Sequence, residues 1–139
     1  MSLKLAPGLA IQKSPIDGKG CFATHFFPKG KKIAEYAGEL ISEREVERRI
    51  KTSRKHRICA IEHDRHLDGA RGGNGTHYIN HSCRPNSYMR LTRGHLLFMA
   101  LRDIRPGEEI TCDYISTHHP DTYRCRCKAE GCRGTINKK

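Results

Sequence analysis

Three cysteines lie close together near the C-terminal end of this 139-residue chain, in the string C-R-C-K-A-E-G-C that contains Cys125, Cys127 and Cys132. Thiolates are strong ligands for Zn²⁺, and a structural zinc site takes four ligands in a tetrahedron. Charged residues interleave these cysteines, which disfavours their burial as free thiols. The spacing therefore indicates a metal site with one position still open. The candidates for that position are the histidines and the remaining cysteines, Cys21, Cys59, Cys83 and Cys112.

A second polar stretch covers residues 78–86, Y-I-N-H-S-C-R-P-N, and ends at a turn stiffened by proline. By itself it is consistent with a turn whose polar groups satisfy one another. His77 and His81 have the i, i+4 spacing of a helical metal-binding pair. The glutamate that follows the first histidine in zinc peptidases is missing, so this pattern disfavours a peptidase-type metal site.

The elements that would carry these residues are mostly short strands. From position 9 to 41, short apolar stretches alternate with glycine and proline, which predicts strands and tight turns. Ser42 and Glu45 form a capping box that predicts a helix to about Ile50. The other predicted elements are a hairpin over 57–68, a mobile glycine-rich loop over 70–75, paired strands over 87–92 and 95–101, a turn at 105–107 and a strand over 109–114. This pattern indicates a mainly β (α+β) fold.

The composition describes a single domain with a strong positive charge. Hydrophobic residues make up 36%, mean hydropathy is −0.71 and the formal net charge is +11. No apolar run approaches the ~20 residues of a membrane span, and positions 1–13 lack a signal sequence, so we expect an intracellular protein. The charge leaves two interpretations open, a soluble basic surface or contact with nucleic acid or nucleic-acid-associated proteins. Four thiolates on one Zn²⁺ would reduce the charge to about +9.

Taken together, five motifs in order resemble those of the SET-domain protein-lysine methyltransferases with a post-SET zinc motif. They are G-K-G-C-F-A at 18–23, E-Y-A-G-E at 35–39, N-H-S-C-R-P-N at 80–86, G-E-E-I-T-C-D-Y at 107–114 and the cysteine cluster at 125–132. The resemblance implies a β-clip-like fold of several small sheets with a knot-like C-terminal closure. It also implies a SET domain over 8–117 and a zinc-bound post-SET tail over 118–139.

The resemblance also implies the site residues. In the family, the cysteine of N-H-S-C joins the three post-SET cysteines on zinc, which assigns Cys83, Cys125, Cys127 and Cys132 to the metal. The cofactor would be S-adenosyl-L-methionine, and the residues matching its binding segments are Gly18, Lys19, Gly20, His77, Asn80, His81, Tyr114 and Thr135. Tyr114 matches the catalytic tyrosine and Tyr36 a second tyrosine of the lysine channel. His77 stands where relatives often carry arginine.

The implied reaction is methylation of a lysine side chain of a histone or another nucleic-acid-associated protein. The lysine amine must lose its proton first, because only about one in 2,500 is neutral at pH 7 for a pKa near 10.4. Cys112 occupies a position where relatives commonly carry a larger aromatic residue, which predicts room for more than one methyl group. The expected location is the nucleus or chromatin in a eukaryote and the cytoplasm in a bacterium.

The sequence leaves two other functions open. One is a SET-like binding module without catalytic activity, which the unusual His77 and Cys112 would suit. The other is a zinc-stabilised nucleic-acid-binding module, which the positive charge and the cysteine cluster would suit. Aromatic residues make up only 6% and tryptophan is absent, which disfavours the second because single-strand binders stack bases on aromatic rings.

Overall fold

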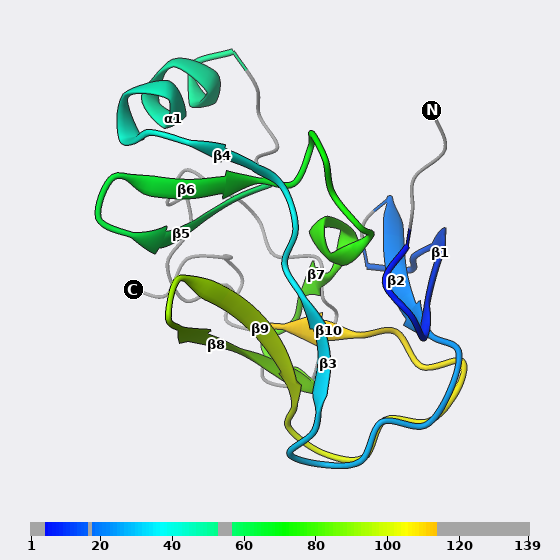
Figure 1. Cartoon of the computed structure of the whole chain (residues 1–139). Coiled ribbons are helices and arrows are strands. Elements are labelled where there is room, and N and C mark those ends of the chain that lie inside the picture. The colour runs from blue at the N-terminus through cyan, green and yellow to red at the C-terminus, as the bar shows by residue number, and fades with distance from the viewer. Residues whose placement is uncertain (1–4, 17, 53–56, 114–139) are drawn as a thin grey trace.

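The fold, seen in a computed structural model that describes residues 5–16, 18–52 and 57–113, consists of three small sheets and short helical segments (Figure 1). The two-stranded sheet pairs β1 (Leu9–Lys13) with β2 (Lys19–Ala23). The five-stranded sheet has the order β3 (Lys32–Glu35), β9 (His95–Ala100), β8 (Ser87–Thr92), β10 (Thr111–Cys112) and β7 (Asn80–His81). The three-stranded sheet has the order β4 (Glu39–Ile41), β6 (Arg65–Asp68) and β5 (Ile58–Glu62). The mainly β prediction is confirmed.

The helix α1 (Glu43–Ile50) begins where the capping box predicts. The Ser42 hydroxyl accepts a hydrogen bond from the Glu45 amide at 3.2 Å, which satisfies one of the unpaired N–H groups at the helix start. Val46 is the buried residue of the helix. Arg49 joins the helix to the three-stranded sheet by donating to Glu39 at 2.5 Å and to Asp68 at 2.7 Å.

Both predicted hairpins are present. Strands β8 and β9 pair antiparallel from Ser87 opposite Ala100 to Thr92 opposite His95. Arg93 and Gly94 connect them with φ of 49° and 78°, the left-handed pair that a two-residue turn with the twist of a hairpin requires. The β5–β6 hairpin turns at residues 63–64.

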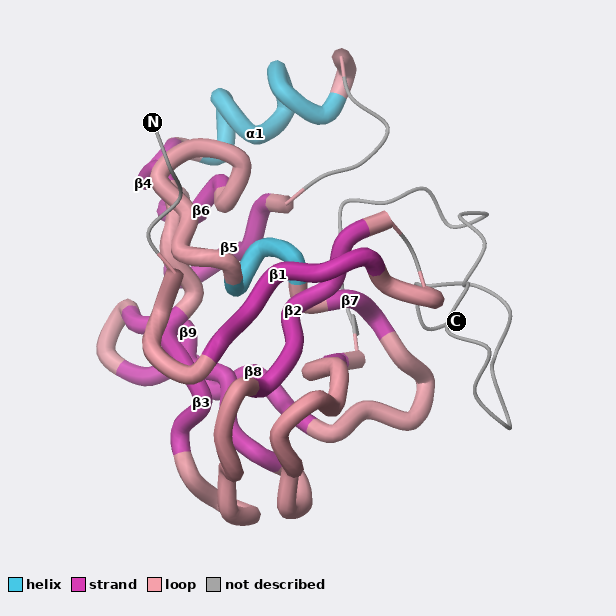
Figure 2. The backbone as a smooth tube through the Cα atoms, turned by 90° about the vertical axis from the view of Figure 1, so that its right-hand side faces the viewer, coloured by secondary structure: helices cyan, strands magenta, loops and turns pink. Residues whose placement is uncertain are grey.

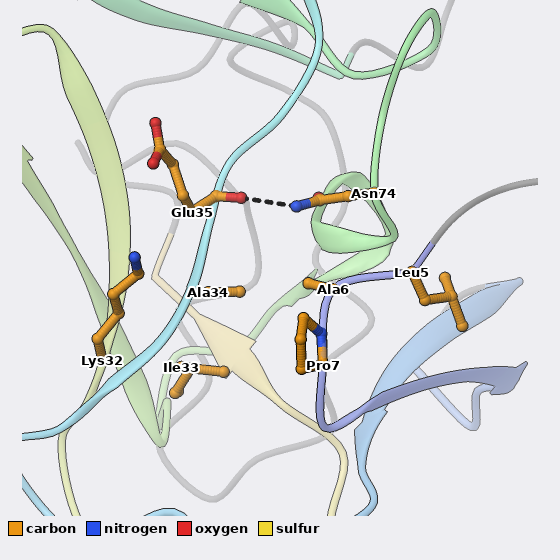
Figure 3. Close-up of a pocket in the computed structure, with 8 residues that line it drawn as sticks. All are labelled: Leu5, Ala6, Pro7, Lys32, Ile33, Ala34, Glu35 and Asn74. Atoms are coloured by element: carbon orange, nitrogen blue, oxygen red, sulfur yellow. Dashed lines mark hydrogen bonds between the residues drawn. The ribbon is translucent and has the colours of Figure 1, made fainter.

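The glycine-rich segment 70–75 contains neither helix nor strand, as predicted, and leads into the 3₁₀ helix η1 (Thr76–Tyr78). Its C-terminal end is tied down by Asn74. The Asn74 carbonyl accepts from the Ala6 amide at 3.0 Å, and its side-chain amide donates to the Glu35 carbonyl at 3.0 Å (Figure 3). Hydrogen bonds across the fold therefore fix the end of a loop for which composition predicted mobility.

The strand expected over 109–114 is shorter in the described part of the chain, because its first residues pair elsewhere. Glu109 bridges to Phe22 of β2, and the Ile110 amide donates to the Cys21 carbonyl at 2.8 Å. The chain then enters the five-stranded sheet as β10, parallel to both β7 and β8. One segment thus joins the β1–β2 sheet to the large sheet (Figure 1), and Figure 2 shows the β1–β2 pair close to β7 of the large sheet.

The core lies between these sheets. Its most deeply buried side chains include Cys21, Phe98, Ile104, Ile110 and Cys112, each at most 2% exposed. No helix among the residues that the structure describes is long and apolar enough to cross a membrane.

Candidate functional site

The buried side chain of Asn80 is the point where three segments of the chain meet. Its amide nitrogen lies 3.2 Å from the Lys19 carbonyl, 2.9 Å from a Glu109 carboxylate oxygen and 3.2 Å from the Ser14 hydroxyl. Ser14 in turn donates to the Glu109 carboxylate at 2.8 Å. These hydrogen bonds hold the start of β2, the start of β7 and the segment before β10 against one another.

The G-x-G segment lies beside this network. Gly18 has a φ of 50°, in the left-handed region that glycine adopts readily, and both Gly18 and Lys19 are exposed. Because Gly18 has no side chain, its exposed surface is backbone that a ligand can approach. Gly20 is buried, and a Cβ atom there would overlap a Glu109 carboxylate oxygen. A side chain at position 20 would therefore have to displace Glu109 and Ser14 from the Asn80 network.

His81 links β7 to β10. The two strands pair with Thr111 opposite Asn80 and Cys112 opposite His81. One His81 ring nitrogen lies 3.6 Å from an Asp113 carboxylate oxygen, and the other lies 3.4 Å from the Cys83 sulfur. His81 is 4% exposed, so its ring lies in the protein interior. There it connects Asp113, the residue before Tyr114, to Cys83 of the N-H-S-C motif.

The four described cysteines fall into two groups. Cys21 and Cys112 are buried in the core and Cys59 packs against it, and burial raises the pKa of Cys21 and Cys59 to about 12 and that of Cys112 well above its usual value. Such thiols resist forming the thiolate that binds metal. Cys83 is half-buried and lies outside the core cluster. The described residues contain no group of three or more metal-binding side chains, and Cys125, Cys127 and Cys132 lie outside the described residues.

His77 lies in η1, whereas His81 lies on β7, so the two do not share one helical face, in agreement with the sequence analysis, which disfavoured a helical metal pair. The His77 side chain is buried, and its Nδ1 has no hydrogen-bonding partner among the described residues. Burial, with a smaller contribution from the charge of Arg57, lowers the His77 pKa to about 4. The ring is therefore neutral at pH 7 and supplies no positive charge where relatives often have arginine.

Tyr36 is buried just after the end of β3, and its hydroxyl donates to the Arg57 carbonyl. It also forms a hydrogen bond with Cys59. Tyr114 and Thr135 lie outside the described residues, so their predicted roles remain predictions. The structure brings Lys19, Asn80 and His81 together as the motif order indicates.

Sequence reasoning missed three residues of this region: Ser14, Arg57 and Glu109. Glu109 stands inside the G-E-E-I motif, so its position carried a signal. Ser14 and Arg57 stand in no motif, and their contacts arise only from tertiary structure.

A separate hollow of about 510 Å³ lies between β3 and the start of the described chain (Figure 3). It is lined by Leu5, Ala6, Pro7, Lys32, Ile33, Ala34, Glu35 and Asn74. None of these residues belongs to the network around Asn80, so we do not assign the hollow to that site.

Comparisons with known proteins identify the family. The family model described as the SET domain matches residues 18–115. The chain is 36% identical over 140 residues to histone-lysine N-methyltransferase TRX1 of rice, covering 93% of this chain and 14% of that protein. It is 39% identical over 130 residues to histone-lysine N-methyltransferase Set2 of Drosophila melanogaster, covering 85% of this chain and 6% of that protein. This chain belongs to the SET-domain family.

A solved structure agrees with this assignment. The methyltransferase domain of human histone-lysine N-methyltransferase SETMAR superposes with a TM-score of 0.81 at 26% identity, covering 96% of this chain and 60% of that one. The chain thus has the SET methyltransferase fold. It spans only a small part of the length of the two curated relatives.

The buried neutral His77 predicts an acid-sensitive contribution to stability. Its folded-state pKa of about 4 lies below the usual value of 6.5. Between these two pH values the unfolded state binds more protons than the folded state. The free energy of unfolding therefore falls as the pH falls from about 6.5 to about 4. Between pH 7.5 and pH 5.0, the free energy of unfolding measured with urea should fall less in His77→Gln than in the wild type. The difference between the two losses should be on the order of 1 kcal/mol. The control is His63→Gln, at an exposed turn position. Equal losses in wild type and His77→Gln would contradict the prediction.

Proposed function

We propose that this chain is an S-adenosyl-L-methionine-dependent protein-lysine N-methyltransferase that acts on a histone or another nucleic-acid-associated protein. One observation carries the proposal: the Asn80 side chain joins the accessible G-x-G backbone to β7, and β7 pairs with the strand that leads to Tyr114. The names of the relatives, which are histone-lysine N-methyltransferases, support the same activity and substrate class. A nuclear or chromatin location in a eukaryote follows from that substrate, with the cytoplasm as the counterpart in a bacterium.

The residues around Asn80 fit the proposed cofactor. Exposed backbone at Gly18 allows close approach, and the buried Nδ1 of His77 offers a polar atom that no described residue engages. Asn80 and His81 would complete the contacts from β7, and Gly20, Tyr114 and Thr135 would contribute as their motif positions imply. Because His77 is neutral, it would act by hydrogen bonding where an arginine would add charge. When bound, S-adenosyl-L-methionine supplies an electrophilic methyl group.

The protein's own contribution would be to hold the lysine amine in its neutral form and aim it. Tyr36 is 5% exposed, so an amine that reached its hydroxyl would lose most of its hydration, and desolvation favours the uncharged amine. The Tyr36 hydroxyl donates a hydrogen bond to the Arg57 carbonyl, and its oxygen would accept an N–H of the amine. Together with Tyr114, it would orient the amine without acting as a strong base.

The experiment that tests the function compares wild type with Tyr114→Phe on arrays of histone peptides and lysine-rich proteins with labelled methyl donor. Wild type should transfer label, and Tyr114→Phe should lose about a hundredfold in rate because the amine is misplaced. Both should release heat on binding S-adenosylhomocysteine in calorimetry. The control is Tyr88→Phe, an exposed tyrosine on β8.

The outcomes separate the three functions. Cofactor binding without transfer to any substrate would favour the catalytically silent module. No heat with S-adenosylhomocysteine would favour the zinc-stabilised nucleic-acid-binding module and contradict the proposal.

We also propose a structural zinc ion bound by Cys83, Cys125, Cys127 and Cys132, in a post-SET tail over 118–139 that follows a SET domain over 8–117. The support is a contrast among the described cysteines. Cys83 is half-buried and lies outside the core cluster, whereas Cys21, Cys59 and Cys112 belong to that cluster or pack against it. The metal would close a loop from residue 83 to the tail, which reduces the entropy lost when the tail orders. The passage of β10 between β7 and β8 supports the knot-like closure.

Zinc analysis tests this site. The wild type should bind about one zinc per chain, and Cys83→Ser should lose most of it because only three thiolates remain. Cys59→Ser should keep its zinc, since Cys59 packs against the core. Full zinc occupancy in Cys83→Ser would reject the assignment.

We propose further that the reaction proceeds beyond one methyl group. Cys112 is 1% exposed on β10, and its side chain is smaller than the aromatic residue that relatives commonly carry at this position. Mass spectrometry should therefore detect di- or trimethyl-lysine with wild type and a shift toward monomethyl-lysine with Cys112→Phe, provided that thermal melts show the variant folded. Wild-type product that stalls at monomethyl-lysine would contradict this.

Direct contact with nucleic acid finds support at the end of the molecule where the loops around Phe27 and Ile104 pair. Lys29, Lys31 and Lys32 are exposed there and form no salt bridge with a carboxylate of the described residues. Phe26 beside them is 47% exposed. This combination of exposed cations and an aromatic ring suits a phosphate backbone.

Salt dependence tests this contact. Fluorescence anisotropy with duplex DNA should show affinity that falls with salt, and changing Lys29, Lys31 and Lys32 to alanine should lower the slope by about 0.9 for each phosphate that the variant no longer neutralises. The control is Arg44→Ala in α1, which lies at the opposite end of the molecule (Figure 1). An unchanged slope in the triple variant would place any DNA contact elsewhere.

A further inference from the structure

The backbone carbonyl of Arg57 accepts two hydrogen bonds. One comes from the Tyr36 hydroxyl and the other from the Gly69 amide at 2.8 Å. The approach is close enough that a Cβ atom on Gly69 would lie 2.6 Å from the Tyr36 hydroxyl oxygen. The Arg57 carbonyl is therefore a fixed acceptor for the Tyr36 O–H bond, in addition to the hydrogen bond between Tyr36 and Cys59.

The side chain of Arg57 reaches a different part of the site. Its guanidinium donates to the His77 carbonyl and lies over the Tyr78 ring, 4.7 Å from the ring centre. Both contacts fall in the segment that runs from η1 into Asn80 and His81. A guanidinium over an aromatic face with a hydrogen bond to a carbonyl is a fixed, two-point attachment.

We propose that Arg57 is a positioning residue that sets the Tyr36 hydroxyl relative to the Asn80–His81 strand. Its carbonyl orients the hydroxyl, and its guanidinium anchors that carbonyl to the segment preceding Asn80. Arg57 touches neither the methyl donor nor the lysine amine in this arrangement. The catalytic consequence rests on the proposed function, because Tyr36 must face the lysine amine for its orientation to affect methyl transfer.

The test has one spectroscopic and one kinetic readout. In protein labelled with ¹³Cζ-tyrosine, Arg57→Ala should shift the Tyr36 resonance, because the guanidinium no longer anchors the carbonyl that accepts from the hydroxyl. The resonance is assigned by its loss in Tyr36→Phe. In methylation assays, Arg57→Ala should lower kcat about tenfold in the presence of the Tyr36 hydroxyl and less than about twofold in Tyr36→Phe, since coupled residues are not additive. Arg57→Lys retains the charge over Tyr78 and should lose less.

The control is Arg65→Ala, at the turn end of the β5–β6 hairpin, where the arginine is exposed and pairs loosely with Glu62 at 3.7 Å. It should change neither readout. An unmoved Tyr36 resonance in folded Arg57→Lys and Arg57→Ala would overturn the positioning role, as would equal kcat losses in the presence and absence of the Tyr36 hydroxyl. A shifted resonance in a protein whose wild type transfers no methyl group would support the positioning role and reject the proposed function.

Discussion

The parallel pairing of β10 with β7 is the constraint on which the rest of the site depends. It places Thr111 beside Asn80 and Cys112 beside His81, although about thirty positions separate the partners in sequence. A parallel pair cannot be joined by a tight turn, so a longer stretch of chain must connect the two strands. Here that stretch forms the β8–β9 hairpin of the same sheet and then runs past β2, and this path brings Glu109 onto Gly20 and Asn80. Loss of this pairing would separate the N-H-S-C motif from the residues that lead to Tyr114.

Buried polar contacts then make the arrangement specific. Asn80 shares its amide among acceptors from three segments, and an amide left without them inside the core would be destabilising. The hydrogen bonds therefore select one relative position of β1–β2, β7 and the segment before β10. Arg57 has a comparable role on the other side of η1, where it joins Tyr36 to His77 and Tyr78. Both networks connect residues that a ligand between them would need in fixed positions.

The cysteines show how burial separates chemically identical residues. Cys21, Cys59 and Cys112 belong to or pack against the core, where desolvation opposes the thiolate form. Cys83 lies outside that cluster, in contact with His81. Composition alone supplied several equivalent candidates for a fourth zinc ligand. Burial distinguishes them physically, in the direction that the motif resemblance also favours.

The sequence by itself determined the local elements and the motif order. The capping box at Ser42 defined the start of α1, Arg93-Gly94 defined a hairpin turn, and the N-H-S-C and G-E-E-I strings indicated the family, because each depends on neighbouring residues alone. The tertiary structure decided that β10 is short and lies between β7 and β8, that Gly20 accommodates Glu109 and that His77 is buried and neutral. It also decided the contacts of Ser14 and Arg57. Ser14 bonds to Glu109, 95 residues away, and Arg57 bonds to Tyr36 and His77, which are 21 and 20 residues away. Such contacts depend on how the sheets pack, and no local pattern encodes that packing.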